Sequence, residues 1–307
     1  MDILDKLIAL AQITGGVTVN CQLQGDWQLI NAPKTNQAVA HIVHKGRAFV
    51  VADELGKELS LQEGDIVFFP RMITHTLSDD TTKNTAQTYP TPTLNYDVFT
   101  RLTVGEGMMG TKACDLFCLH FGYDSGAELI NSLPPMLILH TAGTPLQSMI
   151  ELLKAEALQT KMGSASVVNA LTTMIFTLIL RTFLEQEQGK QGGGVLGILK
   201  GLGEPRLHAL LGKIIQNPEQ EWSVEAMANL AHLSRSQLIR LFNQHLGVSP
   251  HAFVHKLRLQ KSAMLLRQSN DSVLSVALSS GFLSETHFSK AFKKLYGTSP
   301  SQYRLMG

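Results

Sequence analysis

This chain of 307 residues has few cysteines, no long uninterrupted apolar run and no basic segment at its start. Its three cysteines, Cys21, Cys114 and Cys118, are odd in number and too few for a disulfide framework. The most apolar stretch, residues 174–180, contains a threonine, and a transmembrane helix needs about 20 apolar residues. No positively charged segment precedes an apolar one at the N-terminus, as a secretory signal requires. We therefore expect a cytoplasmic protein that does not enter a membrane.

Charge is unevenly distributed along the chain. The net charge is only +1, yet residues 205–307 contain 12 lysines and arginines against 5 aspartates and glutamates. The remaining residues, 1–204, therefore have a balance of −6. This asymmetry indicates a polyanionic partner for the second half, although a chance distribution of surface charge would explain the same numbers.

The first half changes from a strand pattern to a helix pattern. Residues 17–125 contain short apolar runs separated by glycine turns, which is typical of a small barrel or sandwich. Residues 145–187 have apolar positions at helical spacing, and the helix expected over 164–188 is apolar over a very wide surface. Such a helix must be buried on more than one side. We expect the barrel to cover part of it and a second subunit of a homodimer to cover the rest; a purely intramolecular contact is the alternative.

A glycine-rich segment over 189–204 has the composition of a flexible linker. It divides the chain into a predicted N-terminal domain over 1–188 and a C-terminal domain over 205–307. The predicted fold class is α+β: an N-terminal β-barrel with a helical dimerisation segment, followed by an all-α C-terminal domain.

The C-terminal domain contains an internal repeat. Its two copies match in the residues that start and stop helices, at an offset of 49 and then 50 residues. Serines at the expected helix starts accept hydrogen bonds from free backbone amides, and glycines end helices. Each copy therefore reads as helix, turn, helix, and a helix over 250–268 joins the copies. The matched pairs are Ser223 with Ser272, Ala228 with Ala277, Ser234 with Ser284, Phe242 with Phe292, Gly247 with Gly297, and Ser249 with Ser299.

The second helix of each copy exposes side chains that suit base edges. Arginine and lysine donate to guanine, and glutamine and asparagine pair with adenine. Any exposed helix face is polar, but here two such faces repeat within a basic segment. Two units on a rigid spacer fit successive major-groove segments about 34 Å apart on double-stranded DNA. The candidate DNA-binding residues are Arg235, Ser236, Gln237, Arg240, Asn243, Glu285, Thr286, His287, Lys290, Lys293 and Lys294.

These residues carry a resemblance to the AraC/XylS family of transcription regulators. The segment 276–304, with Gly281-Phe282, Ser284-Glu285-Thr286-His287-Phe288 and Ser299-Pro300, is similar to the family signature. The resemblance implies a transcription regulator that works with RNA polymerase, and most members of the family are activators. It implies that Arg240 and Lys290 read bases, with Ser236 and Thr286 beside them in the groove. Ile239 stands where some relatives have a polar base-contacting residue.

The N-terminal half resembles the cupin-type sensor domains attached to many such regulators. Gly64-Asp65-Ile66-Val67-Phe68-Phe69-Pro70 followed by His75 is similar to the second cupin motif. Catalytic cupins carry two histidines and a glutamate in their first motif, whereas the strand after Gly46 contains no histidine. Although His41, His44 and His75 suggest a metal site, the departure predicts no metal, no cofactor and no enzyme activity.

The signal remains open between two alternatives. Several segments, including Asn131-Ser132-Leu133-Pro134, resemble activators of multidrug efflux pumps, which implies a small hydrophobic effector. The other alternative is an oxidant that acts on Cys21 and Cys118, since reactive-chlorine-responsive relatives carry cysteines in similar places. Cys114 and Cys118 share one strand face about 13 Å apart, too far for a disulfide. An ordinary buried Cys118 is the competing interpretation.

Overall fold

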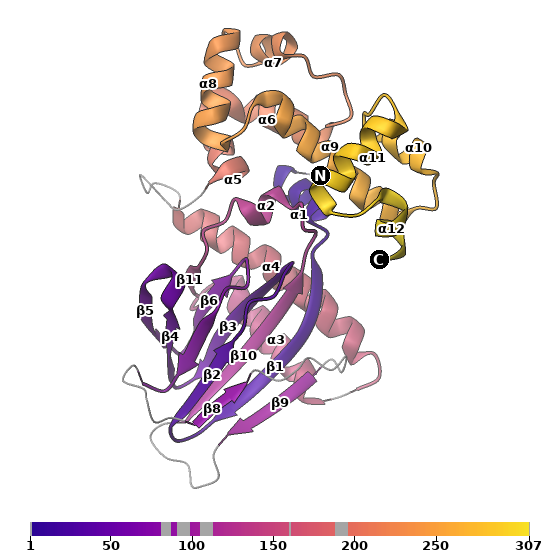
Figure 1. Cartoon of the computed structure of the whole chain (residues 1–307). Coiled ribbons are helices and arrows are strands. Elements are labelled where there is room, and N and C mark those ends of the chain that lie inside the picture. The colour runs from indigo at the N-terminus through magenta and orange to yellow at the C-terminus, as the bar shows by residue number, and fades with distance from the viewer. Residues whose placement is uncertain are drawn as a thin grey trace. The chain divides into compact units, whose positions relative to one another are not determined.

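The computed structural model describes residues 2–80, 87–90, 99–104, 113–159, 161–187 and 196–306. It divides into two compact units (Figure 1). The sheet unit consists of Ile13–Tyr123 and Pro135–Gly193. The helical unit consists of Met1–Gln12, Asp124–Pro134 and Gly194–Gly307. The predicted α+β fold, with a sheet-rich N-terminal part and an all-helical C-terminal part, is confirmed.

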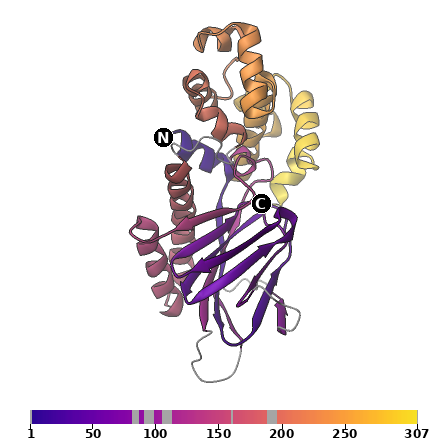
Figure 2. The same cartoon turned by 90° about the vertical axis from the view of Figure 1, so that its left-hand side faces the viewer.

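The sheet unit, drawn again in Figure 2, contains a six-stranded and a five-stranded sheet. The first has the strand order β11-β6-β3-β10-β1-β9, and the second has the order β5-β4-β7-β2-β8. Most neighbours pair antiparallel, and the pairs β1–β9 and β2–β8 are parallel. The strands are β1 (Thr14–Leu23), β2 (Trp27–Asn31), β3 (Gln37–Lys45), β4 (Arg47–Ala52), β5 (Lys57–Gln62), β6 (Asp65–Phe69), β7 (His75–Ser78), β8 (Gln87–Pro90), β9 (Phe99–Val104), β10 (Cys114–Gly122) and β11 (Leu137–His140), with a short helix η1 (Asp53–Leu55) after β4.

Strand alternation divides the six-stranded sheet into two apolar faces. One face, with Val39, Val67 and Cys118, joins the core between the two sheets. The other contacts the long helix α4 (Ser164–Glu187), where Phe176 lies edge-on to Phe68 at 6.0 Å. Helix α3 (Pro145–Gln159) runs beside α4 (Figure 1).

Helix α4 is long and apolar enough, by length and composition, to cross a membrane. The sequence-based judgement that this segment is too short and too polar is therefore wrong by that criterion. Its threonine hydroxyls donate hydrogen bonds to carbonyls of the preceding helical turn, as Thr172 does to Val168 at 2.7 Å. These bonds lower the free-energy cost of placing the hydroxyls among apolar side chains. Half of the 18-residue window that meets this criterion is buried inside the described structure.

The helical unit contains the two predicted helix-turn-helix copies and three further pieces of chain. Residues 189–195 of the predicted linker lie outside the described part. Residues 197–202 form helix α5 instead, in which Ile198 is buried and its amide donates to Ser132 Oγ at 2.9 Å. The helices of this unit are α1 (Ile3–Ala11), α2 (Glu128–Asn131), α5 (Gly197–Leu202), α6 (Pro205–Gln216), α7 (Val224–Leu230), α8 (Arg235–Leu246), α9 (Pro250–Gln268), α10 (Val273–Ser279), α11 (Glu285–Tyr296) and α12 (Pro300–Leu305).

Segments 2–12 and 124–134 belong to the helical unit, although the sequence placed them in the first domain. Asp2 and Asp5 form a capping box at the start of α1, and Leu7 and Leu10 are fully buried. Asp124 is also buried. The two units are therefore not continuous along the sequence. The sequence did not predict this, because a contact between distant segments leaves no local pattern.

Candidate nucleic-acid interface

The first helix-turn-helix copy comprises α7 and α8. Ser223 Oγ caps α7 by accepting a hydrogen bond from the amide of Ala226 at 3.1 Å. Ser234 caps α8 and forms a capping box with Gln237. Gly247 ends α8 in the left-handed conformation, with φ 71°. These are the starts and the stop that the sequence predicts.

The second copy, α10 and α11, has the same construction. Ser272 Oγ accepts from the amide of Ser275 at 3.0 Å, and Ser284 caps α11 through the amide of His287. Gly297 ends α11 with φ 75°. The predicted repeat is therefore confirmed as a structural repeat.

One backbone hydrogen bond, between residues five positions apart, defines the turn in each copy. The amide of Leu233 donates to the carbonyl of Ala228 at 2.9 Å, and the amide of Phe282 donates to the carbonyl of Ala277 at 3.0 Å. Both alanines are buried, since the two helices of each copy approach closely there. A larger side chain at either position would separate the helices.

Aromatic and leucine side chains hold the second helix of each copy against the unit. Phe242 on α8 packs edge-on to Phe253 on α9, with ring centroids 5.9 Å apart. Phe292 on α11 packs edge-on to Tyr303 on α12, with centroids 5.2 Å apart. Because these rings are buried, the opposite sides of α8 and α11 face solvent.

All eleven predicted DNA-binding residues are exposed. On α8, Ser236, Arg240 and Asn243 recur at positions i, i+4 and i+7, which places them on one side of the helix. On α11, the residues 50 positions later, Thr286, Lys290 and Lys293, form the equivalent stripe. We call these two stripes the matched faces.

Some of the predicted residues already have partners within their own copy. Arg235 forms an ion pair with Glu225 on α7, and the side chain of Gln237 belongs to the capping box. Among the described residues, no side-chain hydrogen bond or ion pair engages Arg240 or Lys290. Their charged ends are therefore available to a partner.

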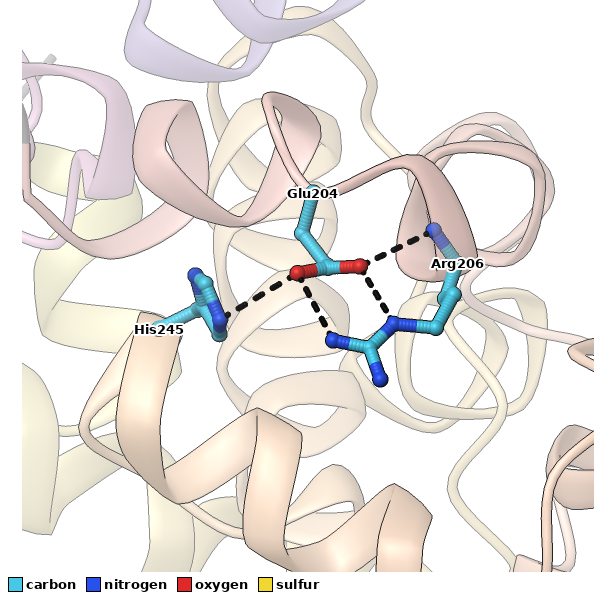
Figure 3. Close-up of polar contacts among 3 residues, drawn as sticks. All are labelled: Glu204, Arg206 and His245. Carbon is cyan, nitrogen blue, oxygen red and sulfur yellow. Dashed lines mark hydrogen bonds and ion pairs between the residues drawn. The ribbon is translucent and has the colours of Figure 1, made fainter. Parts of the chain in front are cut away.

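The start of α6 is tied to the end of α8 (Figure 3). Glu204 caps α6 and binds Arg206 through both carboxylate oxygens, at 2.6 and 3.1 Å. His245, in the last turn of α8, lies 3.5 Å from the same carboxylate. Hydrogen bonding by Arg206, and then its charge, holds the pKa of Glu204 below its usual range. This contact helps to fix the orientation of α8.

A group of three histidines adjoins the second recognition helix, and the sequence identified only one of them. The ring of His287 lies 5.8 Å from that of His255, which lies 6.3 Å from that of His251. Burial lowers the pKa of His255, and His287 and His251 lower it further. The spacing of His251 and His255, four residues apart on α9, was the available signal.

The sheet unit holds a second set of polar residues, in the core between the two sheets. Cys21 on β1 and Cys118 on β10 are both buried in this core. Cys118 Sγ lies 2.9 Å from His41 Nδ1, and His41 Nε2 lies 2.7 Å from His75 Nε2. The sequence singled out these cysteines and histidines separately. Strand pairing brings them together, since Cys118 is the register partner of His41.

Ionisation of this buried set is suppressed. The neighbouring thiol of Cys21 and burial raise the pKa of Cys118 well above its ordinary value. Burial also lowers the pKa of His41, with contributions from His75 and His120, and lowers that of His75 to about 4. The thiol and both imidazoles are therefore neutral near pH 7.

Comparison with known proteins assigns the family. A model of the cupin family matches residues 2–185, and a model described as a helix-turn-helix domain matches residues 227–306. The HTH-type transcriptional regulator MtrA of Neisseria gonorrhoeae is 43% identical over 100% of this chain and 99% of its own. The chain belongs to the AraC family of transcription regulators with an N-terminal cupin domain.

Two further relatives align over almost the whole chain. An uncharacterised HTH-type regulator of Haemophilus influenzae is 37% identical over 99% of this chain and 98% of its own. The RCS-specific activator RclR of Escherichia coli is 27% identical over 99% and 97%, respectively. All three relatives are named as transcription regulators. DNA binding by this transcription regulator follows from its family.

The cupin domain of this AraC-family protein does not fit the metal of catalytic cupins. Strand β4, which follows Gly46, contains no histidine. His41 and His75 approach each other at hydrogen-bond distance, which leaves no space for an ion between their Nε2 atoms. His44 contacts Lys154 and Glu151 instead. Within residues 2–80 and the later described ranges, no group of three or more His, Cys, Asp or Glu side chains is spaced to hold a metal ion.

Proposed function

We propose that this regulator reads an asymmetric DNA site in two blocks, one with each matched face. The observation that carries the proposal is the equivalence of the two faces: Ser236, Arg240 and Asn243 on one helix, and a threonine and two lysines at the same positions of the other. Among the remaining predicted residues, the cations Arg235 and Lys294 flank these stripes and suit phosphate contacts, which position a protein without specifying sequence. Arg240 and Lys290 are the proposed base-reading residues.

The experiment compares promoter affinity of the full-length protein with that of Arg240→Ala and Lys290→Ala. Each variant is expected to weaken specific binding by about 1–3 kcal/mol, about 5- to 150-fold, with relaxed preference at one base pair. Lys213→Ala is the matched control, because Lys213 is an exposed cation on α6, outside both faces. Equal affinity of all three variants and the wild type would contradict the assignment.

The proposed mode of action is activation by a homodimer in the cytoplasm, together with RNA polymerase. The apolar core between the sheets supports a small hydrophobic effector for the cupin domain. The resemblance to activators of efflux pumps supports control of a multidrug efflux operon. Transcription from the bound promoter, measured with purified polymerase and with hydrophobic efflux substrates, tests this. An effect of such a compound on transcription supports it, and repression of the promoter contradicts it.

A second candidate signal is an oxidant, as the name of RclR indicates for that relative. The observation that favours it is that the Cys21 and Cys118 thiols lie in the same buried core, on the paired strands β1 and β10. In the strand register Cys21 faces Leu116 and Cys118 faces Val19, so the cysteines are diagonal neighbours. A disulfide between them requires the backbone of β1 or β10 to move, because diagonal Cα atoms lie about 7–8 Å apart.

Such a movement has a direct route to the helical unit along the chain. Strand β1 starts at Thr14, two residues after Gln12, and β10 ends at Gly122, two residues before Asp124. Gln12 and Asp124 both belong to the helical unit. The test measures promoter affinity of reduced and oxidised protein, for the wild type and for Cys21→Ser and Cys118→Ser. Unchanged oxidant dependence in both variants would remove this candidate.

A further inference from the structure

One backbone carbonyl fixes the protons of a chain of buried side chains. The carbonyl of Ile73 only accepts, so His75 donates to it from Nδ1 at 2.8 Å and keeps Nε2 as an acceptor. His41 Nε2, 2.7 Å from that atom, must therefore donate. Neutral His41 then has an unprotonated Nδ1, which accepts the thiol proton of Cys118 at 2.9 Å. The thiol is thus paired with a base whose tautomer is determined.

Packing holds this chain in place. Phe69 stacks on the His75 ring, with centroids 4.0 Å apart and planes inclined by 18°. The His41 ring meets that of His75 edge-on at 4.9 Å. His41 is fully buried, and His75 and Cys118 are buried beside it. A thiol, a base in hydrogen-bond reach and a third group that orients the base form the arrangement of an activated nucleophile.

We propose that Cys118, His41 and His75 form a Cys–His–His site at which a two-electron oxidant is reduced. Cys118 is the attacking sulfur, His41 is its general base, and His75 is a positioning residue that keeps His41 Nδ1 free of a proton. Cys21 is the second thiol, which closes the disulfide. This inference rests on the oxidant response proposed above and adds the residues that make the thiol reactive.

The chemistry balances with a peroxide as the oxidant. Cys118 sulfur attacks one peroxide oxygen as its proton moves to His41 Nδ1; the S–O bond forms, and the O–O bond breaks. The leaving hydroxide takes up a proton to become water, which leaves a neutral sulfenic acid and returns His41 to its starting tautomer. Cys21 sulfur then attacks Cys118 sulfur, the S–O bond breaks, and a second water leaves. Overall, two thiols and one hydrogen peroxide give one disulfide and two waters.

The raised pKa of Cys118 is consistent with this role. A thiol that is protonated at rest is protected, and a general base can remove its proton while the new bond forms, as histidine does for a serine hydroxyl. The titratable groups that face the site are Cys21 on β1, Cys114 and His120 on β10, and His75 on β7. Because His41 removes the thiol proton during the attack, the oxidation rate of Cys118 does not depend on the thiolate fraction. The rate should therefore be nearly independent of pH between 6 and 8. An ordinary thiol loses about 80-fold in thiolate over this range.

The experiment follows disulfide formation by mass spectrometry after addition of hydrogen peroxide to the full-length reduced protein, from pH 6 to pH 8. The wild type should vary by less than about 3-fold. His41→Asn retains a polar side chain but removes the base, so it should oxidise about 10²–10⁴-fold more slowly, with a rate that rises with pH. His75→Gln keeps an acceptor for His41 and should retain most of the rate, whereas His75→Leu should lose it. Circular dichroism of each reduced variant checks its fold.

The outcomes separate this site from the wider oxidant response. A wild-type rate that rises with pH like that of a free thiol overturns the site, even if no variant folds. An oxidation rate of His41→Asn equal to that of the wild type overturns the role of His41. If the Cys21–Cys118 disulfide still alters promoter affinity in that case, the proposed oxidant response is supported without this site. Absence of any Cys21–Cys118 disulfide in the wild type overturns both.

Discussion

Tyr296 Oη donates a hydrogen bond to Asp124 Oδ1 at 2.9 Å, across 172 positions of the chain. Tyr303 donates to the other carboxylate oxygen, and the amide of Gly126 also binds Asp124, at 2.9 Å. Burial and the Asp124 charge raise the pKa of both tyrosines, so both hydroxyls remain donors. A residue just after strand β10 therefore anchors the second helix-turn-helix copy within the helical unit.

Asp124→Ala should destabilise the helical unit by about 1–3 kcal/mol, because it leaves two largely buried hydroxyls without their acceptor. Asp124→Asn keeps one acceptor oxygen, so its free energy of unfolding should lie between those of the wild type and the alanine variant. Urea unfolding followed by far-ultraviolet circular dichroism measures the change. Glu221→Ala removes an exposed carboxylate from the same unit and is the control. Equal midpoints for Asp124→Ala and Glu221→Ala would show that the tyrosine contacts do not stabilise the unit.

Gly281→Ala should be more harmful than Gly247→Ala, although both glycines have positive φ. At Gly281, with φ 88°, an added Cβ would lie 2.7 Å from the carbonyl oxygen of Glu219 and 2.8 Å from its Cα. At Gly247, with φ 71°, it would meet nothing within 4 Å. Gly247→Ala should therefore cost about 1–2 kcal/mol for its backbone conformation alone, and Gly281→Ala more. Thermal unfolding of the two variants measures their losses of stability. Equal losses would show that the turn of the second copy moves to make room for the added Cβ.

The helix-turn-helix repeat could be predicted from sequence because its signals are local. Ser234 and Gly247 mark the ends of α8 through bonds to residues within four positions. The place of Asp124 in the helical unit left no such signal, since its partners are far along the chain. Cys118 and His41 were recognised as candidates one by one. Their contact depends on the register between β3 and β10, which sequence alternation does not determine.

Glu204→Gln should reduce the acid sensitivity of the helical unit. Because Arg206 lowers the pKa of Glu204 in the folded state, the ionised carboxylate stabilises the unit above the ordinary glutamate pKa of 4.5. That contribution is lost as pH falls through the lower folded value. The difference in urea midpoint between wild type and Glu204→Gln should be positive at pH 6 and shrink toward pH 3. A difference that stays constant with pH would contradict the linkage.

Met174→Glu should weaken the proposed homodimer at least 10-fold. Most of the wide apolar surface of α4 is covered within the sheet unit, and the apolar positions left exposed include Met174 and Val167, at 51% and 42%. A charge buried between two copies is costly unless it is paired. Analytical ultracentrifugation measures the dissociation constant. Met162→Glu is the control, because Met162 is fully exposed just before α4. A dimer of unchanged strength would place the interface elsewhere.

The central claim is that the two matched faces read two separate DNA blocks, and genome-wide capture of DNA bound to the full-length protein tests it most directly. Motif analysis of the captured fragments should give one asymmetric site with two blocks about one helical turn, or about 34 Å, apart. The same capture with Arg240→Ala should lose preference in one block, and with Lys290→Ala in the other. Fragments that share no sequence, or a motif that both variants leave intact, would contradict this account.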